Sequence, residues 1–170
     1  MDISSVFRLD GRVALVTGGS RGIGKMFVEG LLQSGCSKVY ISARKVEQME
    51  ETINELGADK VIGIPADLSQ MDGIQTLVDE ISAKEDKLDI LINNAGAAWG
   101  QPYTEFTEAG WDRTMDLNVK TPFFLTQKLH DLLVAAGKGD HPAKVIHVSS
   151  IDGQRINPWE TYPYQASKAA

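Results

Sequence analysis

The sequence predicts an α/β fold in which a parallel sheet lies between two layers of helices. Short runs of apolar and β-branched residues alternate along the chain with longer segments of helical periodicity. The apolar runs are nearly continuous, which is typical of strands that are buried on both faces of a parallel sheet. A chain of 170 residues is long enough for one such unit, so we expect a single domain over residues 1–170.

The first half of the chain predicts three strands and three helices in alternation. The strands are the short apolar runs 13–16, 38–42 and 61–64. The helices that follow them are expected over about 22–34, over 46–56 and around 74–81. Gly35 and Gly57 come directly after the first two helices, and glycine in that place is a common stop signal.

The second half continues the alternation. We expect a fourth strand over 88–92, a long helix from about 110 to 136 that bends near Pro122, and a fifth strand over 144–148. A polar loop follows over 149–163, and a last helix begins near Tyr164. Right-handed crossovers between the strands give a doubly wound, Rossmann-like fold with three α/β/α layers. Segment 137–142 reads as a surface loop.

Composition and charge limit the classes of function. The net charge of -6 disfavours binding to nucleic acid or to an anionic membrane surface. No apolar run approaches the roughly 20 residues of a membrane helix, and the start of the chain lacks a secretory signal, so we expect a cytoplasmic protein. Cys36 is the single cysteine and the three histidines are dispersed, so we expect neither a disulfide nor a metal site.

A glycine-rich turn links the first predicted strand to the first predicted helix. It reads Thr17-Gly18-Gly19-Ser20-Arg21-Gly22-Ile23-Gly24. Residues without a Cβ allow a tight turn and a close approach of phosphate to the backbone. The free amides and the positive dipole end of a helix N-terminus then bind an anion. This setting predicts a nicotinamide dinucleotide site that includes Gly18, Ser20, Arg21, Gly22, Ile23 and Gly24.

The end of the second strand predicts which dinucleotide is bound. An acidic residue about 20 positions after the glycine turn would bind the ribose 2′-hydroxyl of NAD. Arg44 stands there instead, and Arg21 lies within the turn itself. Two arginines that converge on one phosphate favour NADP(H) over NAD(H).

The spacing of the glycine turn is T-G-x-x-x-G-x-G, and on this spacing the chain resembles the short-chain dehydrogenase/reductase family. Asp67-Leu68 resembles the pair that contacts adenine in that family, and Asn93-Asn94-Ala95-Gly96 resembles its N-N-A-G segment. The resemblance implies that Asp67, Leu68, Asn94, Ala95 and Gly96 contribute to the cofactor site. From the residues alone, Asp67 could also cap the next helix.

Tyr164-Gln165-Ala166-Ser167-Lys168 matches the Y-x-x-x-K pattern of the family. Residues four apart share one helix face, and a lysine ammonium beside a phenol favours the phenolate. Tyr164 can then act as general acid or base, and both Tyr164 and Lys168 would also contact the cofactor. The resemblance assigns the carbonyl-polarising serine to Ser150, with Ser149 as the alternative, and a proton-relay role to Asn118.

The resemblance implies an NADP-dependent oxidoreductase that transfers a hydride between nicotinamide and a carbonyl or secondary alcohol. The contexts of Trp99 and Trp111 are similar to those in ketoacyl reductases of the RhlG type. Trp99 and Trp159 either border a substrate pocket or pack in the core.

The family's subunits are longer than this chain and form homo-oligomers. Strands and a substrate-binding loop that follow the catalytic helix in the family are therefore expected to be missing here. The alternative hypothesis is a truncated fragment that binds dinucleotide without turnover.

Overall fold

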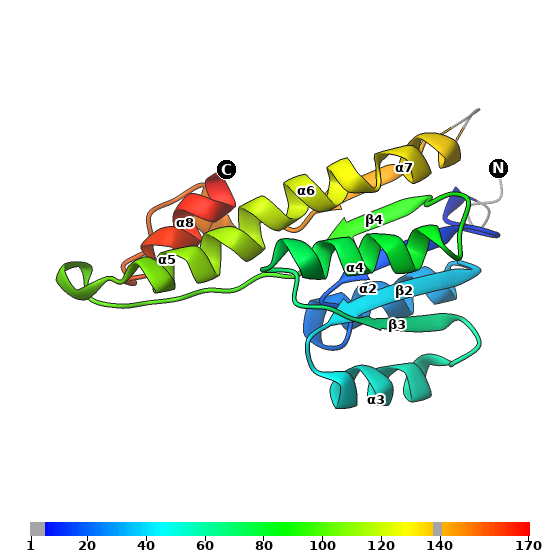
Figure 1. Cartoon of the computed structure of the whole chain (residues 1–170), viewed down its shortest axis with the longest axis horizontal. Coiled ribbons are helices and arrows are strands. Elements are labelled where there is room, and N and C mark those ends of the chain that lie inside the picture. The colour runs from blue at the N-terminus through cyan, green and yellow to red at the C-terminus, as the bar shows by residue number, and fades with distance from the viewer. Residues whose placement is uncertain (1–5, 138–140) are drawn as a thin grey trace.

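The computed structural model describes residues 6–137 and 141–170, and within them five strands form one parallel sheet (Figure 1). Residues 1–5 and the middle of the expected loop 137–142 lie outside the described residues. The strand order is β3-β2-β1-β4-β5, which is the doubly wound order. β2 and β3 are added on one side of β1, and β4 and β5 are added on its other side. The strands are β1 (Val13–Thr17), β2 (Lys38–Ala43), β3 (Val61–Pro65), β4 (Ile90–Asn93) and β5 (Lys144–His147).

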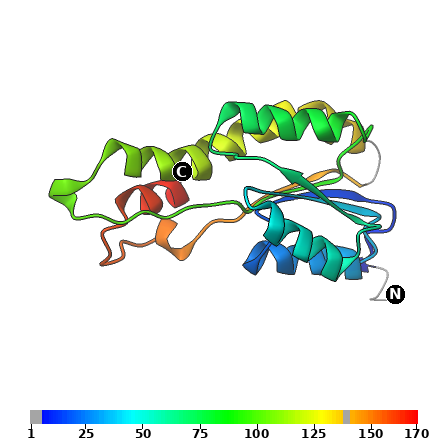
Figure 2. The same cartoon turned by 60° about the horizontal axis from the view of Figure 1, so that its bottom comes forward.

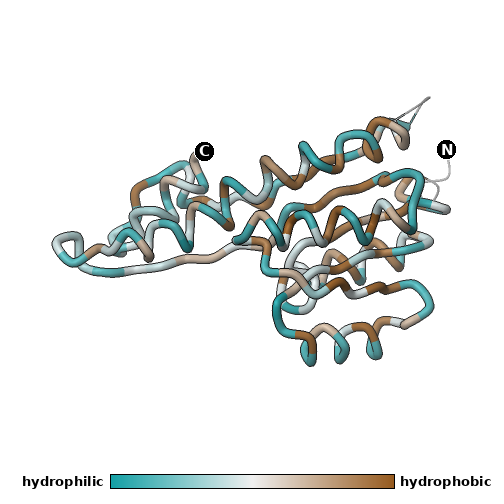
Figure 3. The backbone as a smooth tube through the Cα atoms, in the orientation of Figure 1, coloured by the Kyte–Doolittle hydropathy of each residue, from teal (hydrophilic) through white to brown (hydrophobic). Residues whose placement is uncertain are grey.

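Helices cover both faces of the sheet, which confirms the predicted three-layer fold (Figure 2). One face carries α2 (Gly22–Gln33) and α3 (Val46–Leu56), whose Val28 and Met49 join a buried cluster with β1 and β2. The other face carries α4 (Met71–Ser82), α6 (Thr121–Lys128) and α7 (His130–Ala136). Figure 3 shows hydrophobic positions running along the strands and recurring on one side of α3.

The fifth strand departs from the expectation that every strand is buried on both faces. All four residues of β5 are exposed, and among the described strands β5 pairs only with β4. An apolar run predicts burial only where another layer lies against it, and the described helices do not cover this edge.

The predicted long helix is interrupted in two places. It consists of α5 (Glu108–Met115), a π-helical segment η2 (Asp116–Lys120), α6 and α7, with a break at Leu129. The first irregularity lies directly before Pro122, as predicted, because proline has no N–H to donate to the carbonyl of Asn118. The N–H of Thr121 bonds instead to the carbonyl of Asp116, five residues back.

The starts of the last helix and of β4 each differ from the prediction by two residues. The last helix, α8 (Tyr162–Ala169), begins two residues early, with Pro163 in its first turn, where a missing N–H costs nothing. β4 begins at Ile90, although the backbone of Asp89 still bonds to Val13 and Lys144; the Asp89 side chain also accepts the N–H of Val13 and pairs with the Arg12 guanidinium. Two short 3₁₀ turns are also present: η3 (Ile151–Gly153) falls in the predicted loop 149–163, and η1 (Tyr103–Glu105) precedes α5. No helix in the described part of the chain is long and apolar enough to span a membrane.

Candidate active site

The turn between β1 and α2 needs glycine at several positions. Gly18 and Gly22 have φ angles of +67° and +54°, which side chains other than glycine rarely adopt. A Cβ on Gly24 would lie 2.1 Å from the carbonyl oxygen of Gly18. The turn and α2 can therefore pack this closely only because residue 24 has no side chain. No side chain of the described residues caps α2, which leaves its first amides free for an anion.

Thr17 ties this turn to the end of β4. Its Oγ1 accepts the backbone N–H groups of Asn94 and Ala95 at 3.0 and 2.9 Å. The Asn94 side chain donates in return to the carbonyl of Thr17 at 2.9 Å. The N-N-A-G segment is therefore fixed beside the glycine turn, at the point where the strand order reverses and ligands of doubly wound sheets bind.

A cavity of about 410 Å³ opens at this point. Its lining includes every predicted cofactor residue of the glycine turn, of the end of β2 and of the two segments that resemble the family. These twelve residues are Gly18, Ser20, Arg21, Gly22, Ile23, Gly24, Arg44, Asp67, Leu68, Asn94, Ala95 and Gly96. The carboxylate of Asp67 accepts bonds from the N–H and hydroxyl of Ser69. Because α4 begins at Met71 with Gln70 as its N-cap, Asp67 does not cap that helix.

Sequence reasoning missed several residues of this cavity, of which Ser42 is the most informative. Lys45 and Gln48 also line it, near Arg44. Ser42 is 1% exposed, and its hydroxyl has no hydrogen-bond partner within the described residues. The one available signal was its place near the end of a predicted strand, two residues before Arg44.

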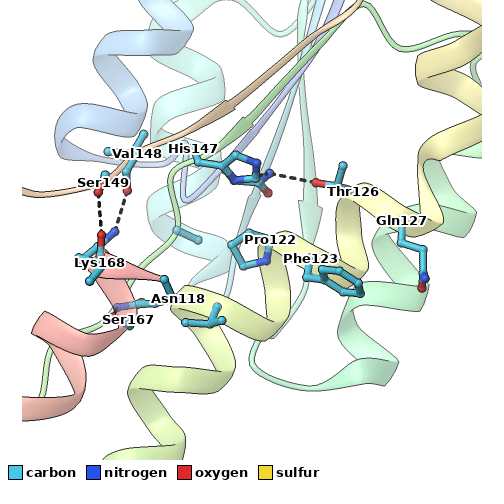
Figure 4. Close-up of a pocket in the computed structure, with 15 residues that line it drawn as sticks. Asn118, Pro122, Phe123, Thr126, Gln127, His147, Val148, Ser149, Ser167 and Lys168 are labelled. Atoms are coloured by element: carbon cyan, nitrogen blue, oxygen red, sulfur yellow. Dashed lines mark hydrogen bonds between the residues drawn. The ribbon is translucent and has the colours of Figure 1, made fainter. Parts of the chain in front are cut away.

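A second cavity, of about 660 Å³, adjoins the first at Ala95, which lines both (Figure 4). Lys168 enters it from α8 and donates from Nζ to the carbonyl of Val148 at 2.7 Å. Ser149 donates from its hydroxyl to the Lys168 carbonyl at 3.0 Å. Burial lowers the pKa of the Lys168 ammonium, because a desolvated charge is less stable than a hydrated one.

The Asn118 side chain joins three segments of the chain. Its Nδ2 donates to the Ala97 carbonyl and to the Ser167 hydroxyl, both at 2.9 Å. Its Oδ1 accepts the N–H of Ala97 at 2.8 Å. Ser167 donates onward to the Tyr164 carbonyl at 2.8 Å, so α8 is linked through Asn118 to the segment after β4.

Tyr164 and Lys168 lie together on α8, as their spacing predicted, with the ammonium 5.8 Å from the centroid of the tyrosine ring. Tyr164 is half-buried, and neither it nor Ser150 lines the two cavities. The two candidate serines differ in what their hydroxyls do. The Ser149 hydroxyl donates its proton to the backbone carbonyl of Lys168. The Ser150 hydroxyl, in contrast, only accepts a hydrogen bond, from the N–H of Asp152 at 3.2 Å. Ser150 therefore keeps a hydroxyl proton to donate.

Trp99 packs against α5 and lines neither cavity. Its Nε1 donates to Gln101 at 2.9 Å, and the Arg113 guanidinium lies 4.8 Å from its ring centroid. Trp99 therefore packs on α5, half-buried and outside the two core clusters of the sheet. Trp159 is 66% exposed in the loop before α8 and also lines neither cavity.

Comparison with known proteins identifies the family. The model of the short chain dehydrogenase family matches residues 12–170. The chain belongs to this family. The curated relatives include the rhamnolipids biosynthesis 3-oxoacyl-[acyl-carrier-protein] reductase of Pseudomonas aeruginosa, which is 42% identical over 165 residues. The alignment covers 96% of this chain and 64% of that protein. The 2-dehydro-3-deoxy-D-gluconate 5-dehydrogenase of Escherichia coli is 38% identical, over 88% of this chain and 57% of its own length.

Solved structures of family members have the same fold. The Pseudomonas aeruginosa RhlG/NADP active-site complex has a TM-score of 0.91 at 42% identity, over 96% of this chain and 64% of that one. A gluconate 5-dehydrogenase from Burkholderia cenocepacia, in complex with NADP and tartrate, has a TM-score of 0.81 at 30% identity, over 96% and 63%. The chain thus spans between 57% and 64% of the length of these family members.

Proposed function

We propose that this chain carries the cofactor site and the proton-transfer group of an NADP(H)-dependent oxidoreductase that acts on a carbonyl or a secondary alcohol. The observation that carries the proposal is the cavity of about 410 Å³, whose wall combines the glycine turn with Arg21 and Arg44. Membership of the short chain dehydrogenase family supports the reaction class. The similar RhlG structure is an NADP complex, which supports the choice of cofactor.

The residues of the cavity fit an NADP molecule. Gly24 leaves no room for a side chain beside Gly18, which suits a pyrophosphate that must approach the backbone. Arg21 and Arg44 are exposed cations that would hold the 2′-phosphate, with Asp67 and Leu68 beside the adenine. When bound, the nicotinamide supplies the hydride that the protein itself cannot.

Three residues then handle the substrate oxygen. Ser150 donates a hydrogen bond that polarises the carbonyl, and Tyr164 delivers a proton to it during reduction. Lys168 holds a positive charge beside the Tyr164 ring, which favours loss of the phenolic proton. Pro122 leaves the backbone carbonyl of Asn118 without its usual helical donor. This carbonyl would accept a hydrogen bond from a water molecule that returns a proton to Tyr164 through Lys168.

Replacement of Tyr164 by phenylalanine tests this mechanism. We expect Tyr164→Phe to lower kcat by at least about a hundredfold, because the proton donor is lost while the ring remains. The measurement is NADPH oxidation, followed by absorbance, with 3-oxoacyl esters tried first because the 42% identical relative is named a 3-oxoacyl reductase. Equal rates for the variant and the native chain would rule out Tyr164 as the acid.

Replacement of Arg44 by aspartate tests the cofactor choice. Arg44→Asp should weaken NADPH binding and improve NADH binding, since a carboxylate repels the 2′-phosphate and accepts from a 2′-hydroxyl. Dissociation constants for both cofactors, measured by fluorescence titration, give the ratio. The control is Lys45→Ala, a neighbouring cation, which should change both affinities together. An unchanged ratio in Arg44→Asp would remove Arg44 from the site.

The second candidate is dinucleotide binding without turnover. It rests on the cavity of about 410 Å³ alone, since neither Tyr164 nor Ser150 lines that cavity. The two candidates make different predictions: tight NADPH binding with no oxidation of NADPH by any carbonyl supports the second.

For the oxidoreductase we also propose assembly into a homo-oligomer, which sedimentation would test.

A further inference from the structure

The loop that precedes α8 is held by one buried side chain. Within the exposed and half-buried segment 151–160, Asn157 is the only buried residue, at 7% exposure. Its neighbours Ile156 and Trp159 are 92% and 66% exposed. Burying a polar amide is unfavourable unless it is hydrogen-bonded, so we expect a specific hydrogen-bond partner for the Asn157 side chain.

That partner is the residue that follows Tyr164. Asn157 Oδ1 accepts from the Gln165 side chain at 3.0 Å and from the N–H of Trp159 at 2.9 Å. Gln165 extends the same contact to the Trp159 carbonyl at 3.5 Å. The other end of the Asn157 amide, Nδ2, has no hydrogen-bond partner within the described residues. Asn157 therefore acts here only as an acceptor.

The start of α8 is held by apolar packing, since Tyr162 lies edge-to-face against Tyr103 and Phe106 and Pro163 is buried, but few polar contacts fix its rotation. The helix has eight residues, a length at which an isolated helix is marginal, and no side-chain cap is present on Thr161. The turn before it is itself tied to the segment after β4, because the N–H of Gln101 bonds to the Glu160 carbonyl at 3.1 Å. Asn157 and Gln165 thus connect a fixed turn to the first turn of the helix that carries Tyr164.

We propose that Asn157 is a positioning residue, which acts through Gln165 to set the place and rotation of Tyr164 on α8. The inference rests on the proposed function, in which Tyr164 delivers the proton. Proton transfer depends steeply on the position of the donor, whereas most of the predicted cofactor contacts lie on the wall of the first cavity and not on α8. Loss of the Asn157 contact therefore lowers kcat much more than it lowers the affinity for NADPH.

Asn157→Ala and Asn157→Asp form the decisive pair. Aspartate keeps both acceptor contacts and replaces the unpartnered Nδ2 group by a second carboxylate oxygen, which also brings a negative charge to a buried position. We expect Asn157→Ala to lower kcat about tenfold or more, with NADPH affinity within about twofold, and Asn157→Asp to restore most of the native kcat. Gln165→Ala should match Asn157→Ala, and the double variant should be no slower than either. Gln154→Ala, an exposed amide in the same loop, is the control that leaves kcat unchanged.

The outcomes separate this inference from the proposed function. If Tyr164→Phe retains native activity, the proposed function fails. If Tyr164→Phe is inactive but Asn157→Ala has native kcat, the positioning role alone is overturned. Equal losses of kcat in Asn157→Ala and Asn157→Asp, with native hydrogen exchange over residues 162–170 in both variants, would also overturn it. If the native chain shows no turnover, hydrogen exchange over residues 162–170 gives the answer: faster exchange in Asn157→Ala and native exchange in Asn157→Asp support the inference, and unchanged exchange in both contradicts it.

Discussion

Tyr40 lies in the middle of β2 with none of its surface exposed, and its hydroxyl has a charged partner. The phenol donates to Glu85 Oε1 at 2.7 Å, and Lys38 donates to the same oxygen at 2.6 Å. Burial, followed by the bond to Glu85 and its negative charge, raises the pKa of the Tyr40 phenol above its ordinary range. The proton of Tyr40 is therefore held more tightly in the folded chain than in the unfolded chain.

This difference predicts a loss of stability at alkaline pH. Above about pH 10 the unfolded phenol ionises while the folded one does not, so the free energy of unfolding falls as the pH rises. Tyr40→Phe removes this contribution, at a cost near neutral pH of about 1 kcal/mol because Glu85 keeps its bond to Lys38. Urea unfolding at a series of pH values should show the stability gap between the two proteins narrowing above about pH 10. Parallel curves would contradict the assignment.

At the scale of elements, the junction between the segment after β4 and α5 depends on one glycine. A Cβ on Gly110, in the first turn of α5, would lie 2.5 Å from Cδ1 of Trp99 and 3.0 Å from the Gln101 side chain. Gln101 Oε1 in turn accepts from the Trp99 indole and from the Thr107 hydroxyl. The Trp99 indole thus packs between the segment after β4 and helix α5.

Alanine at two helical glycines should act in opposite directions. Gly110→Ala forces the Trp99 ring to move and should destabilise the fold by about 1–3 kcal/mol, despite the better helix propensity of alanine. Gly30→Ala in α2, where no atom lies within 4 Å of the added methyl group, should instead stabilise it by up to about 1 kcal/mol. Thermal unfolding measures both.

The contact with Trp99 is tested by combining substitutions. In a Trp99→Ala background the added methyl group of Gly110→Ala meets no indole, so most of its cost should disappear. Additive effects in the double variant would show that the strain at Gly110 comes from elsewhere.

At the scale of the whole molecule, the sheet is buried at its centre and exposed at the β5 edge. The central strands β1 and β4 are buried in every residue, whereas β5 leaves Val145 and Ile146 39% and 43% exposed. An edge strand with apolar side chains and unpaired backbone groups is a template for association.

We therefore expect the chain to self-associate through β5. Val145→Lys places a charge on this edge and should shift the sedimentation profile toward the monomer, because a lysine opposes strand pairing. Val46→Lys is the matched control, since Val46 is also 39% exposed and lies on α3, which packs on β2 and β3 at the other end of the sheet. Equal sedimentation of the native chain and Val145→Lys would place the contact elsewhere.

The sequence by itself determined the features that depend on neighbouring residues. The strand–turn–helix of Thr17 to Gly24, the four-residue spacing of Tyr164 and Lys168, and the interruption near Pro122 were all predicted, because backbone sterics and helix periodicity act over a few positions. The alternation of strands and helices then sufficed for the doubly wound order.

Only the tertiary structure decided what depends on contacts between distant segments. The unpartnered hydroxyl of Ser42 in the cavity wall, the packing of Trp99 on Gly110 and the buried amide of Asn157 have no local signal. The exposure of β5 is of the same kind, since an apolar run specifies a strand but not what covers it. Burial is a property of two surfaces, and a sequence pattern describes one of them.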